Sequence, residues 1–204
     1  MLEIRQLPEP IAYDAGLRLQ QACVEAILAG TGGDVILLLE HQPVYTIGRL
    51  RDQSSLRDCA ALPVPVVETN RGGQATYHGP GQLVGYPIID LNARGRDLHH
   101  HLRQLEEVII RVCVGFGVAA SRRAGLTGVW VDDRKLASIG VGVRKWISMH
   151  GFALNVTPQC LPPFGAITPC GLAGVTMTSL TTEAGRPISM AAAAAALTSE
   201  LQEI

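Results

Sequence analysis

The sequence predicts an α/β (α+β) fold in which a mixed sheet is flanked by helices. Three observations lead to this fold class. Short apolar runs with the length of strands alternate with segments that have the period of helices. Several of the strand-like runs are separated by only a few residues, as in antiparallel hairpins. The chain has 204 residues, 47% of them hydrophobic, so we expect a single domain spanning residues 1–204 with a full core.

The first half of the chain contains one expected helix and several expected strands. Residues 12–29 have apolar positions at helical spacing and end before Gly30, a typical residue after a helix C-terminus. The aliphatic residues 35–39 are expected to form a buried strand. Residues 50–65 contain two prolines and are expected to form a loop. Further strands are expected at residues 43–48, 66–68 and 83–89.

The second half begins with the strongest helical period of the chain, at residues 97–114. Asp97 can cap this helix, and Gly115 and Gly117 can end it. A turn at residues 132–134 is expected to join the first two of three following strands. Those strands are expected at residues 128–131, 136–143 and 147–156. Two more helices are expected, one starting near residues 178–179 and one running from residue 189 through the alanine-rich tail.

Composition excludes several classes of protein. The formal net charge is −1, so no global charge favours nucleic acid or an anionic membrane as partner. The N-terminus has no signal-peptide pattern, and no run of roughly 18 apolar residues is present, so no membrane span is expected. The five cysteines are an odd number without CxxC spacing, which argues against a disulfide framework and a zinc ribbon. A reducing cytoplasm is the expected location.

The most informative stretch is the glycine-rich segment 71–82. Four glycines in twelve residues let the backbone approach a ligand closely, and Arg71, Thr76, Tyr77 and His78 place polar and aromatic groups beside it. We interpret this segment as a binding loop. The sequence does not indicate a nucleotide site. The phosphate-loop pattern GxxxxGK[ST] is absent. Residues 115–120 match the dinucleotide pattern GxGxxA but follow a helix instead of a strand, so we interpret these glycines as a helix cap.

The histidines do not predict a metal site. Residues 99–101 are three consecutive histidines, but successive helix residues point about 100° apart, so these rings cannot converge on one ion. A solvated helix start is expected there. His41, His78 and His150 are isolated in sequence. Of these, His78 is the candidate functional residue because of its loop.

Among the cysteines, Cys170 has the most distinctive setting. Cys23 and Cys113 fall within expected helices and are interpreted as core residues, and neither Cys59 nor Cys160 has an evident activating neighbour. Cys170 lies between a rigid proline and a permissive glycine, shortly before a helix, and such a setting exposes a side chain at a fixed place. From these residues alone, a plain loop cysteine and a nucleophile both remain open.

Lys135 is unusual in a chain that otherwise uses arginine. Of the 17 Lys and Arg residues, only Lys135 and Lys145 are lysine. Lys135 begins an apolar strand. Arginine cannot be deprotonated in a protein, whereas a buried lysine can release and accept protons. This placement is suggestive of proton transfer.

Taken together, these segments resemble the lipoyl(octanoyl) transferase family, whose members begin protein lipoylation. The matching pieces follow one another in the family's order from about residue 35 to 180. They are Glu40-His41-Gln42-Pro43-Val44-Tyr45-Thr46-Ile47-Gly48-Arg49, residues 71–82, Gly128-Val129-Trp130-Val131, Lys135-Leu136-Ala137-Ser138-Ile139-Gly140, residues 150–156 and Pro169-Cys170-Gly171.

The resemblance implies the fold of biotin and lipoate protein ligases, a mixed sheet backed by helices in one domain. It also implies transfer of an octanoyl (lipoyl) group from acyl carrier protein to a lysine of lipoyl domains, those of 2-oxoacid dehydrogenase E2 subunits and glycine cleavage H protein. Cys170 would form the acyl-thioester, and Lys135 would lower its pKa. No cofactor or metal is implied. The acyl group would be lined by Arg71, Gly72, Gly73, Gln74, Ala75, Thr76, Tyr77, His78, Ser138, Ile139, Gly140, Gly151, Phe152 and Ala153.

Two further expectations concern charge stabilisation and docking. Backbone N–H groups at residues 71–73 or around residue 171 could stabilise the tetrahedral oxyanion. Both expected partners are acidic proteins, so we expect Arg49, Arg71 and Arg144 with Lys145 to contribute to a basic rim.

Three alternative functions remain open from the sequence. An ATP-dependent lipoate or biotin ligase would have the same fold but would activate the carboxylate as an adenylate. A thiol hydrolase using Cys170 and His78 would release free acid. A non-catalytic acyl-binding or carrier-docking protein would bind without turnover.

Overall fold

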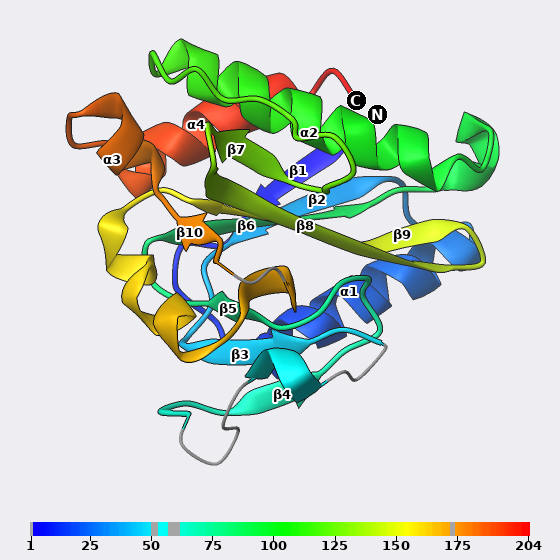
Figure 1. Cartoon of the computed structure of the whole chain (residues 1–204). Coiled ribbons are helices and arrows are strands. Elements are labelled where there is room, and N and C mark those ends of the chain that lie inside the picture. The colour runs from blue at the N-terminus through cyan, green and yellow to red at the C-terminus, as the bar shows by residue number, and fades with distance from the viewer. Residues whose placement is uncertain (1, 50–52, 57–61, 172–173) are drawn as a thin grey trace.

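The computed structural model describes residues 2–49, 53–56, 62–171 and 174–204, except for the side chains of Gln53 and Cys170. Most of its strands form one mixed sheet of seven strands (Figure 1). Along the sheet the order is β1 (Glu3–Gln6), β2 (Val35–Leu39), β6 (Gln82–Ile88), β9 (Ile147–Asn155), β8 (Arg134–Arg144) and β10 (Thr176–Met177), with β7 (Val129–Val131) also paired to β8.

Helices cover both faces of this sheet, as Figure 1 shows. The helices α2 (Leu98–Gly115) and α4 (Met190–Leu201) lie on one face, with the short α3 (Leu180–Ala184) at its edge. The helix α1 (Tyr13–Leu28) packs against β6 and β9 from the other face. A second sheet of three strands lies below the large sheet in Figure 1, in the order β4 (Val66–Glu68), β3 (Val44–Ile47) and β5 (Thr76–His78).

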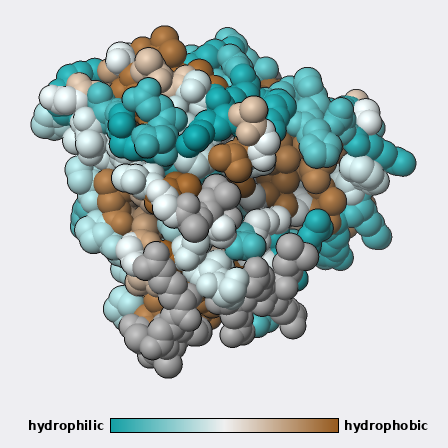
Figure 2. Space-filling view, viewed as in Figure 1, coloured by the Kyte–Doolittle hydropathy of each residue, from teal (hydrophilic) through white to brown (hydrophobic). Residues whose placement is uncertain are grey.

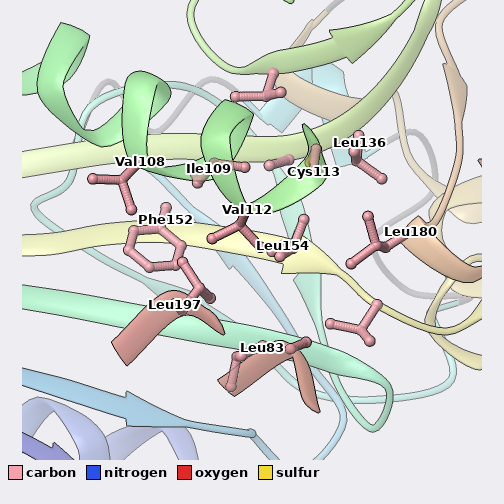
Figure 3. Packing of buried hydrophobic residues seen from close by; sticks show 14 of the residues in the cluster. Leu83, Val108, Ile109, Val112, Cys113, Leu136, Phe152, Leu154, Leu180 and Leu197 are labelled. Atoms are coloured by element: carbon pink, nitrogen blue, oxygen red, sulfur yellow. The ribbon is translucent and has the colours of Figure 1, made fainter. Parts of the chain in front are cut away.

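The largest part of the core lies between α2, α4 and the large sheet. Val108, Ile109 and Val112 project from α2 toward Phe152 and Leu154 of β9 (Figure 3). These positions recur at helical spacing on α2 and at every second residue on β9, so one face of α2 packs against one face of β9. Fully burying side chains of this size contributes about 1.5–3 kcal/mol each.

The structure confirms the fold class and most of the expected elements. The helix N-termini lie where capping residues predicted them, because the side chains of Asp97, Ser179 and Ser189 accept hydrogen bonds from the N–H groups of His100, Thr182 and Ala192. Gly117 has φ 81° just after α2 ends, in agreement with its interpretation as part of a helix cap.

The sequence did not predict three of the strands or the division into two sheets. β1 has the mixed sequence EIRQ and lies at the sheet edge, where little of it is buried. β10 has two residues. β5 lies inside the glycine-rich segment, which was expected to be a loop throughout. The expected loop at residues 50–65 contains a 3-10 helix at Gln53–Leu56, while residues 50–52 and 57–61 are outside the described part.

None of the described helices is long and apolar enough to cross a membrane.

The hairpin between β8 and β9 has a strained turn. Arg144 pairs with Ile147, so the turn has two residues, Lys145 and Trp146, and both have positive φ, 51° and 65°. Two-residue turns of this kind favour Asn-Gly because other side chains are strained there. The backbone is held from outside: Asn92 Nδ2 donates to the Lys145 carbonyl and the Leu91 N–H donates to the Trp146 carbonyl.

Replacing both turn residues, Lys145→Asn with Trp146→Gly, is expected to stabilise the protein by about 1 kcal/mol. The gain comes from relief of left-handed strain, and it is reduced by the greater freedom of glycine in the unfolded chain. Urea unfolding of the wild type and the double variant measures the difference. A lower unfolding midpoint in the variant would show that the two side chains stabilise the fold more than their backbone conformation costs.

Candidate active site

A cavity of about 360 Å³ lies between β8 and β9, the segment that leads into β5, the start of α2 and residues 125–127. Lys135 lines it, together with most of the residues expected to surround the acyl group. From the glycine-rich segment these are Arg71, Gly72, Gly73, Gln74, Thr76 and His78. From the two strands they are Ser138, Ile139, Gly140, Gly151, Phe152 and Ala153.

Ala75 and Tyr77 are the exceptions in the expected lining. Both are buried in a separate hydrophobic cluster on the other side of the small sheet, with Phe164 and Ile167. The reason is the alternation of β5, which turns Thr76 and His78 toward the cavity and Tyr77 away from it. Because residues 71–78 were predicted to form a loop, no alternation of side chains between two faces was expected there.

Glycine at position 140 allows the glycine-rich segment to cross the large sheet closely. The Gly72 N–H donates to the Val141 carbonyl at 2.9 Å. A Cβ placed on Gly140 would lie 2.8 Å from the Gly72 carbonyl oxygen, which is too close for a side chain. Since Gly140 pairs with Gly151 in the sheet, this part of the cavity wall is made largely of backbone.

Apolar side chains provide the remaining walls. Leu98 and Leu102 come from α2, Leu126 from the following loop, and Ile139 and Phe152 from the sheet. Figure 2 shows apolar surface across the middle of the face seen in Figure 1, below the hydrophilic surface over α2. A cavity of this volume with largely apolar walls suits a medium-length acyl chain.

Arg71 does not belong to a basic rim. Its side chain is buried, and its guanidinium donates to the hydroxyl and carbonyl oxygens of Thr46 and to the Gly72 carbonyl. Arg144 is exposed but forms an ion pair with Glu25. Arg49 is exposed and lines the cavity, so among these arginines it fits the expected rim best.

Buried tyrosines and histidines lie together beside the cavity. His78 stacks on Tyr13, its Nδ1 lies 2.7 Å from Gln82 Oε1, and Nε2 of His41 lies 2.7 Å from the Tyr86 hydroxyl. Burial lowers the pKa of His41 and of His150 to about 4, and it lowers the pKa of His78 well below its usual value. These rings are therefore neutral at pH 7, and His78 lacks the charge that would activate a thiol.

The consecutive histidines differ from their expected solvated state in one position. His99 and His100 are exposed, whereas His101 is buried and its pKa is lowered to about 4 by burial. Helical geometry explains the difference, because His101 faces the core side of α2. Within the described part of the chain, no group of three or more potential ligands could hold a metal ion.

The buried histidines make the fold sensitive to acid. Because their folded pKa is lowered, the unfolded chain binds protons below about pH 6.5 while the folded chain does not, so stability present at neutral pH is lost as pH falls toward 4. Each such group contributes about 1.4 kcal/mol per pH unit in that window.

We expect the variant His101→Leu to show a shallower loss of unfolding free energy than the wild type between pH 6 and 4.5. The exposed His100→Gln is the matched control and should follow the wild type. Urea unfolding at several pH values measures both slopes. Equal slopes in all three proteins would contradict the assignment of His101 as a buried neutral group.

Lys135 is buried at the second position of β8, where it pairs with Met177 of β10. Its carbonyl accepts the Thr178 N–H at 3.0 Å, which fixes the backbone next to β10. The Nζ atom lies 5.2 Å from the centroid of the Trp130 ring. A cation over an aromatic face is favourable in this geometry.

The backbone of Cys170 belongs to the 3-10 helix Pro169–Gly171, which packs beside β5. Gly171 has φ 68°, and a Cβ placed on it would overlap the side chain of Gln74, a residue that lines the cavity. The turn that carries Cys170 therefore packs against Gln74, a residue that lines the cavity in which Lys135 lies. The side chain of Cys170 itself is outside the described part.

The three other thiols in the described part of the chain are not activated. Burial raises the pKa of Cys113 and of Cys160 to about 12. It also raises the pKa of the half-buried Cys23. A raised pKa leaves little thiolate at neutral pH. Cys59 was expected to lack an activator and lies outside the described residues.

Sequence reasoning missed several residues of the cavity. Tyr13 and Tyr86 were read only as parts of a helix and a strand, and Leu98 and Leu102 only as core positions of a helix. Residues 125–127 have no regular pattern, so the sequence carried no signal for them. His150 did stand inside a segment that carried the family resemblance.

Comparisons with known proteins agree on one family. Residues 12–202 match the family described as "Lipoyl protein ligase A/B catalytic domain". The Octanoyltransferase of Geobacter metallireducens is 54% identical over 180 residues, which are 88% of this chain and 83% of that protein. The Octanoyltransferase of Syntrophotalea carbinolica is 50% identical over 190 residues, which are 93% of this chain and 88% of that protein.

Solved structures show the same fold at low identity. A lipoate-protein ligase A bound with ATP has a TM-score of 0.76 and 17% identity, with 98% of this chain and 85% of that chain covered. A bi-partite lipoate protein ligase from Thermoplasma acidophilum, studied with its E2 lipoyl domain, has a TM-score of 0.75 and 18% identity, with 100% and 84% covered. The fold is therefore that of lipoate protein ligases, and the high identity to curated relatives over most of both chains shows that this chain is an acyltransferase that belongs to the octanoyltransferase family.

Proposed function

We propose that the protein transfers an octanoyl or lipoyl group from acyl carrier protein to a lysine of lipoyl domains through an acyl-thioester on Cys170. The observation that carries this proposal is buried Lys135 in a largely apolar cavity whose lining residue Gln74 packs against the turn of Cys170. The names of the curated relatives support octanoyl as the acyl group. The Thermoplasma ligase with its E2 lipoyl domain supports a lipoyl domain as the acceptor.

In the first half-reaction the Cys170 thiolate attacks the carbonyl carbon of the donor thioester. The bond between that carbon and the carrier sulfur breaks, and the carrier thiolate takes a proton from the Lys135 ammonium. A nearby ammonium also favours the thiolate form of cysteine, whose ordinary pKa is about 8.5. The enzyme then carries the acyl group on Cys170, and Lys135 is a neutral amine.

In the second half-reaction the neutral amine of the acceptor lysine attacks the enzyme thioester. Lys135 accepts the proton that the attacking nitrogen loses, and the Cys170 thiolate leaves as the amide forms. The starting charges are thereby restored. Thioester exchange is nearly isoenergetic and thioester to amide is downhill, so this route consumes no ATP.

The position of the glycine-rich segment supports a role in charge stabilisation. Residues 72 and 73 line the cavity, and the Gly72 N–H is engaged by the Val141 carbonyl. Gly73, which has φ 81°, therefore remains the candidate donor of that segment for the tetrahedral oxyanion. Backbone N–H groups near residue 171 are the other candidates.

We further propose that the protein acts in the cytoplasm on E2 subunits of 2-oxoacid dehydrogenases and on glycine cleavage H protein. The free thiols of Cys23, Cys113 and Cys160 support a reducing location.

Intact mass spectrometry tests the proposal most directly. Mixed with octanoyl-loaded acyl carrier protein, the wild-type protein is expected to gain the mass of one octanoyl group, which peptide mapping places on Cys170. Adding an apo lipoyl domain is expected to move the group to its lysine. Transfer that requires ATP would point to a ligase, release of free octanoate to a hydrolase, and binding without adduct to an acyl-binding protein.

A further inference from the structure

Gly128 packs against the reactive end of Lys135. It has φ 122°, a conformation that glycine adopts and other residues rarely do. A Cβ placed on it would lie 2.9 Å from Cε and 3.4 Å from Nζ of Lys135, and 2.6 Å from the Ala137 carbonyl oxygen. The end of the Lys135 side chain therefore occupies the space that a side chain at position 128 would need.

The buried carboxylate of Glu106 fixes Gly128 in this place. Glu106 lies on α2 with its side chain fully buried, and its Oε1 accepts the Gly128 N–H at 3.0 Å. Its Oε2 accepts from Arg103 Nη1 at 2.6 Å and from Arg122 Nε at 3.0 Å. Two guanidinium groups thus compensate the buried charge, while the other oxygen is committed to the backbone beside Lys135.

The Trp130 ring provides a further surface for the amine. The ring is fully buried, and its backbone exchanges two hydrogen bonds with Ser121, at 2.7 and 2.9 Å. The guanidinium of Arg123 lies 5.0 Å from the ring centroid, comparable to the 5.2 Å of Lys135 Nζ. The chain from residue 121 to 130 is therefore anchored at both ends, and its middle, residues 125–127, lines the cavity.

We propose that Glu106 and Gly128 are positioning residues that hold the Lys135 amine where it can pair with the Cys170 thiolate; this inference rests on the proposed function. Glu106 does not line the cavity and acts only through the backbone of Gly128. Positioning matters here because a displacement of about 1 Å in a catalytic group can cost about a hundredfold in rate.

The variants separate positioning from folding. Gly128→Ala places a methyl group against Lys135. Gly117→Ala is its matched control, because Gly117 also has a positive φ, 81°, in the connection after α2, but a Cβ there meets nothing within 4 Å. Glu106→Leu removes the acceptor for the Gly128 N–H, whereas Glu106→Gln keeps an oxygen at that place.

Three quantities are measured: the thermal midpoint, the kcat and KM for octanoyl transfer, and the rate at which iodoacetamide alkylates Cys170. Alkylation reports the thiolate without any acyl substrate. Gly128→Ala and Glu106→Leu are expected to lower kcat and the alkylation rate by at least about tenfold with little change in KM. Gly117→Ala is expected to lose stability only, and Glu106→Gln to recover most of the alkylation rate that Glu106→Leu loses.

Wild-type alkylation and kcat in both Gly128→Ala and Glu106→Leu would overturn the positioning role. If Gly128→Ala does not fold, the comparison of Glu106→Leu with Glu106→Gln decides alone, and equal alkylation rates in that pair overturn it. Lys135→Met separates this inference from the proposed function. Unchanged alkylation in Lys135→Met would defeat the proposed pairing itself, whereas slow alkylation there with normal rates in the positioning variants defeats only the positioning role.

Discussion

Cys170→Ala is expected to lower octanoyl transfer to a lipoyl domain by more than about a thousandfold, because in the proposed mechanism Cys170 is the nucleophile that receives the acyl group. The acyl adduct should be absent from its intact mass. Binding of the octanoyl-loaded carrier is expected to persist, since the apolar parts of the cavity wall remain. Single-turnover transfer followed by mass spectrometry measures the loss, and a binding titration with the loaded carrier measures what is retained.

Cys23→Ser is the matched control for Cys170→Ala. Cys23 lies on α1, does not line the cavity, and has a pKa raised by burial. This variant should form the adduct and complete the transfer at the wild-type rate. Transfer by Cys170→Ala at a comparable rate would mean that the acyl group passes directly from donor to acceptor, and the thioester mechanism would have to be abandoned.

Cys170→Ser adds a finer distinction. A serine hydroxyl can attack the donor only if a base removes its proton. His78 at the side of the cavity is a weak base, because burial holds its pKa well below the usual value and its Nδ1 is hydrogen-bonded to Gln82. The oxygen ester that forms is also a less reactive acyl donor toward an amine than a thioester. Slow acylation followed by slower release is therefore expected, and accumulation of an ester on residue 170 would separate the two half-reactions.

The sequence predicted the fold well where local patterns decide the structure. The period of α2 and the cap at Asp97 both follow from neighbouring residues, and both are confirmed. The buried strand β2 consists only of aliphatic residues, so no other interpretation competed with it. β1 and β10 could not be predicted in the same way, since these short strands form by pairing with β2 and β8, which are distant in sequence.

The candidate site was less accessible to sequence reasoning, because its walls come from separate parts of the chain. Motif resemblance brought together the glycine-rich segment, Gly140 of β8 and Gly151 of β9. It did not reveal that Arg71 would be buried against Thr46, since burial depends on where the small sheet packs. Nor did it single out Glu106, whose neighbours in sequence form an ordinary amphipathic helix and whose partner Gly128 lies 22 residues further along.

Lys135→Met and Lys135→Arg together are expected to separate the two roles proposed for the Lys135 amine, stabilising the thiolate and accepting a proton. Methionine has a similar length but no charge, so it should slow both the alkylation of Cys170 and the overall transfer, the latter by about 10²–10⁴-fold. Arginine keeps a positive charge that favours the thiolate but cannot accept a proton. Acylation of Cys170 should therefore be less impaired in Lys135→Arg, and the adduct should accumulate because transfer to the acceptor amine is slow.

The contact between Lys135 and Gly128 sharpens this comparison. A guanidinium is longer than an ammonium and planar, and the space beyond Cε is bounded by the α-carbon of Gly128 and the Trp130 ring. If steric displacement alone governed the outcome, Lys135→Arg would lose the first half-reaction as completely as Lys135→Met. Rapid-quench measurement of each half-reaction distinguishes the two cases. The acyl adduct accumulates in Lys135→Arg only if the guanidinium still favours the Cys170 thiolate and the proton acceptor for the acceptor amine has been lost. A wild-type rate of transfer in either variant would contradict a catalytic role of Lys135, and its burial at the cavity would then need another explanation.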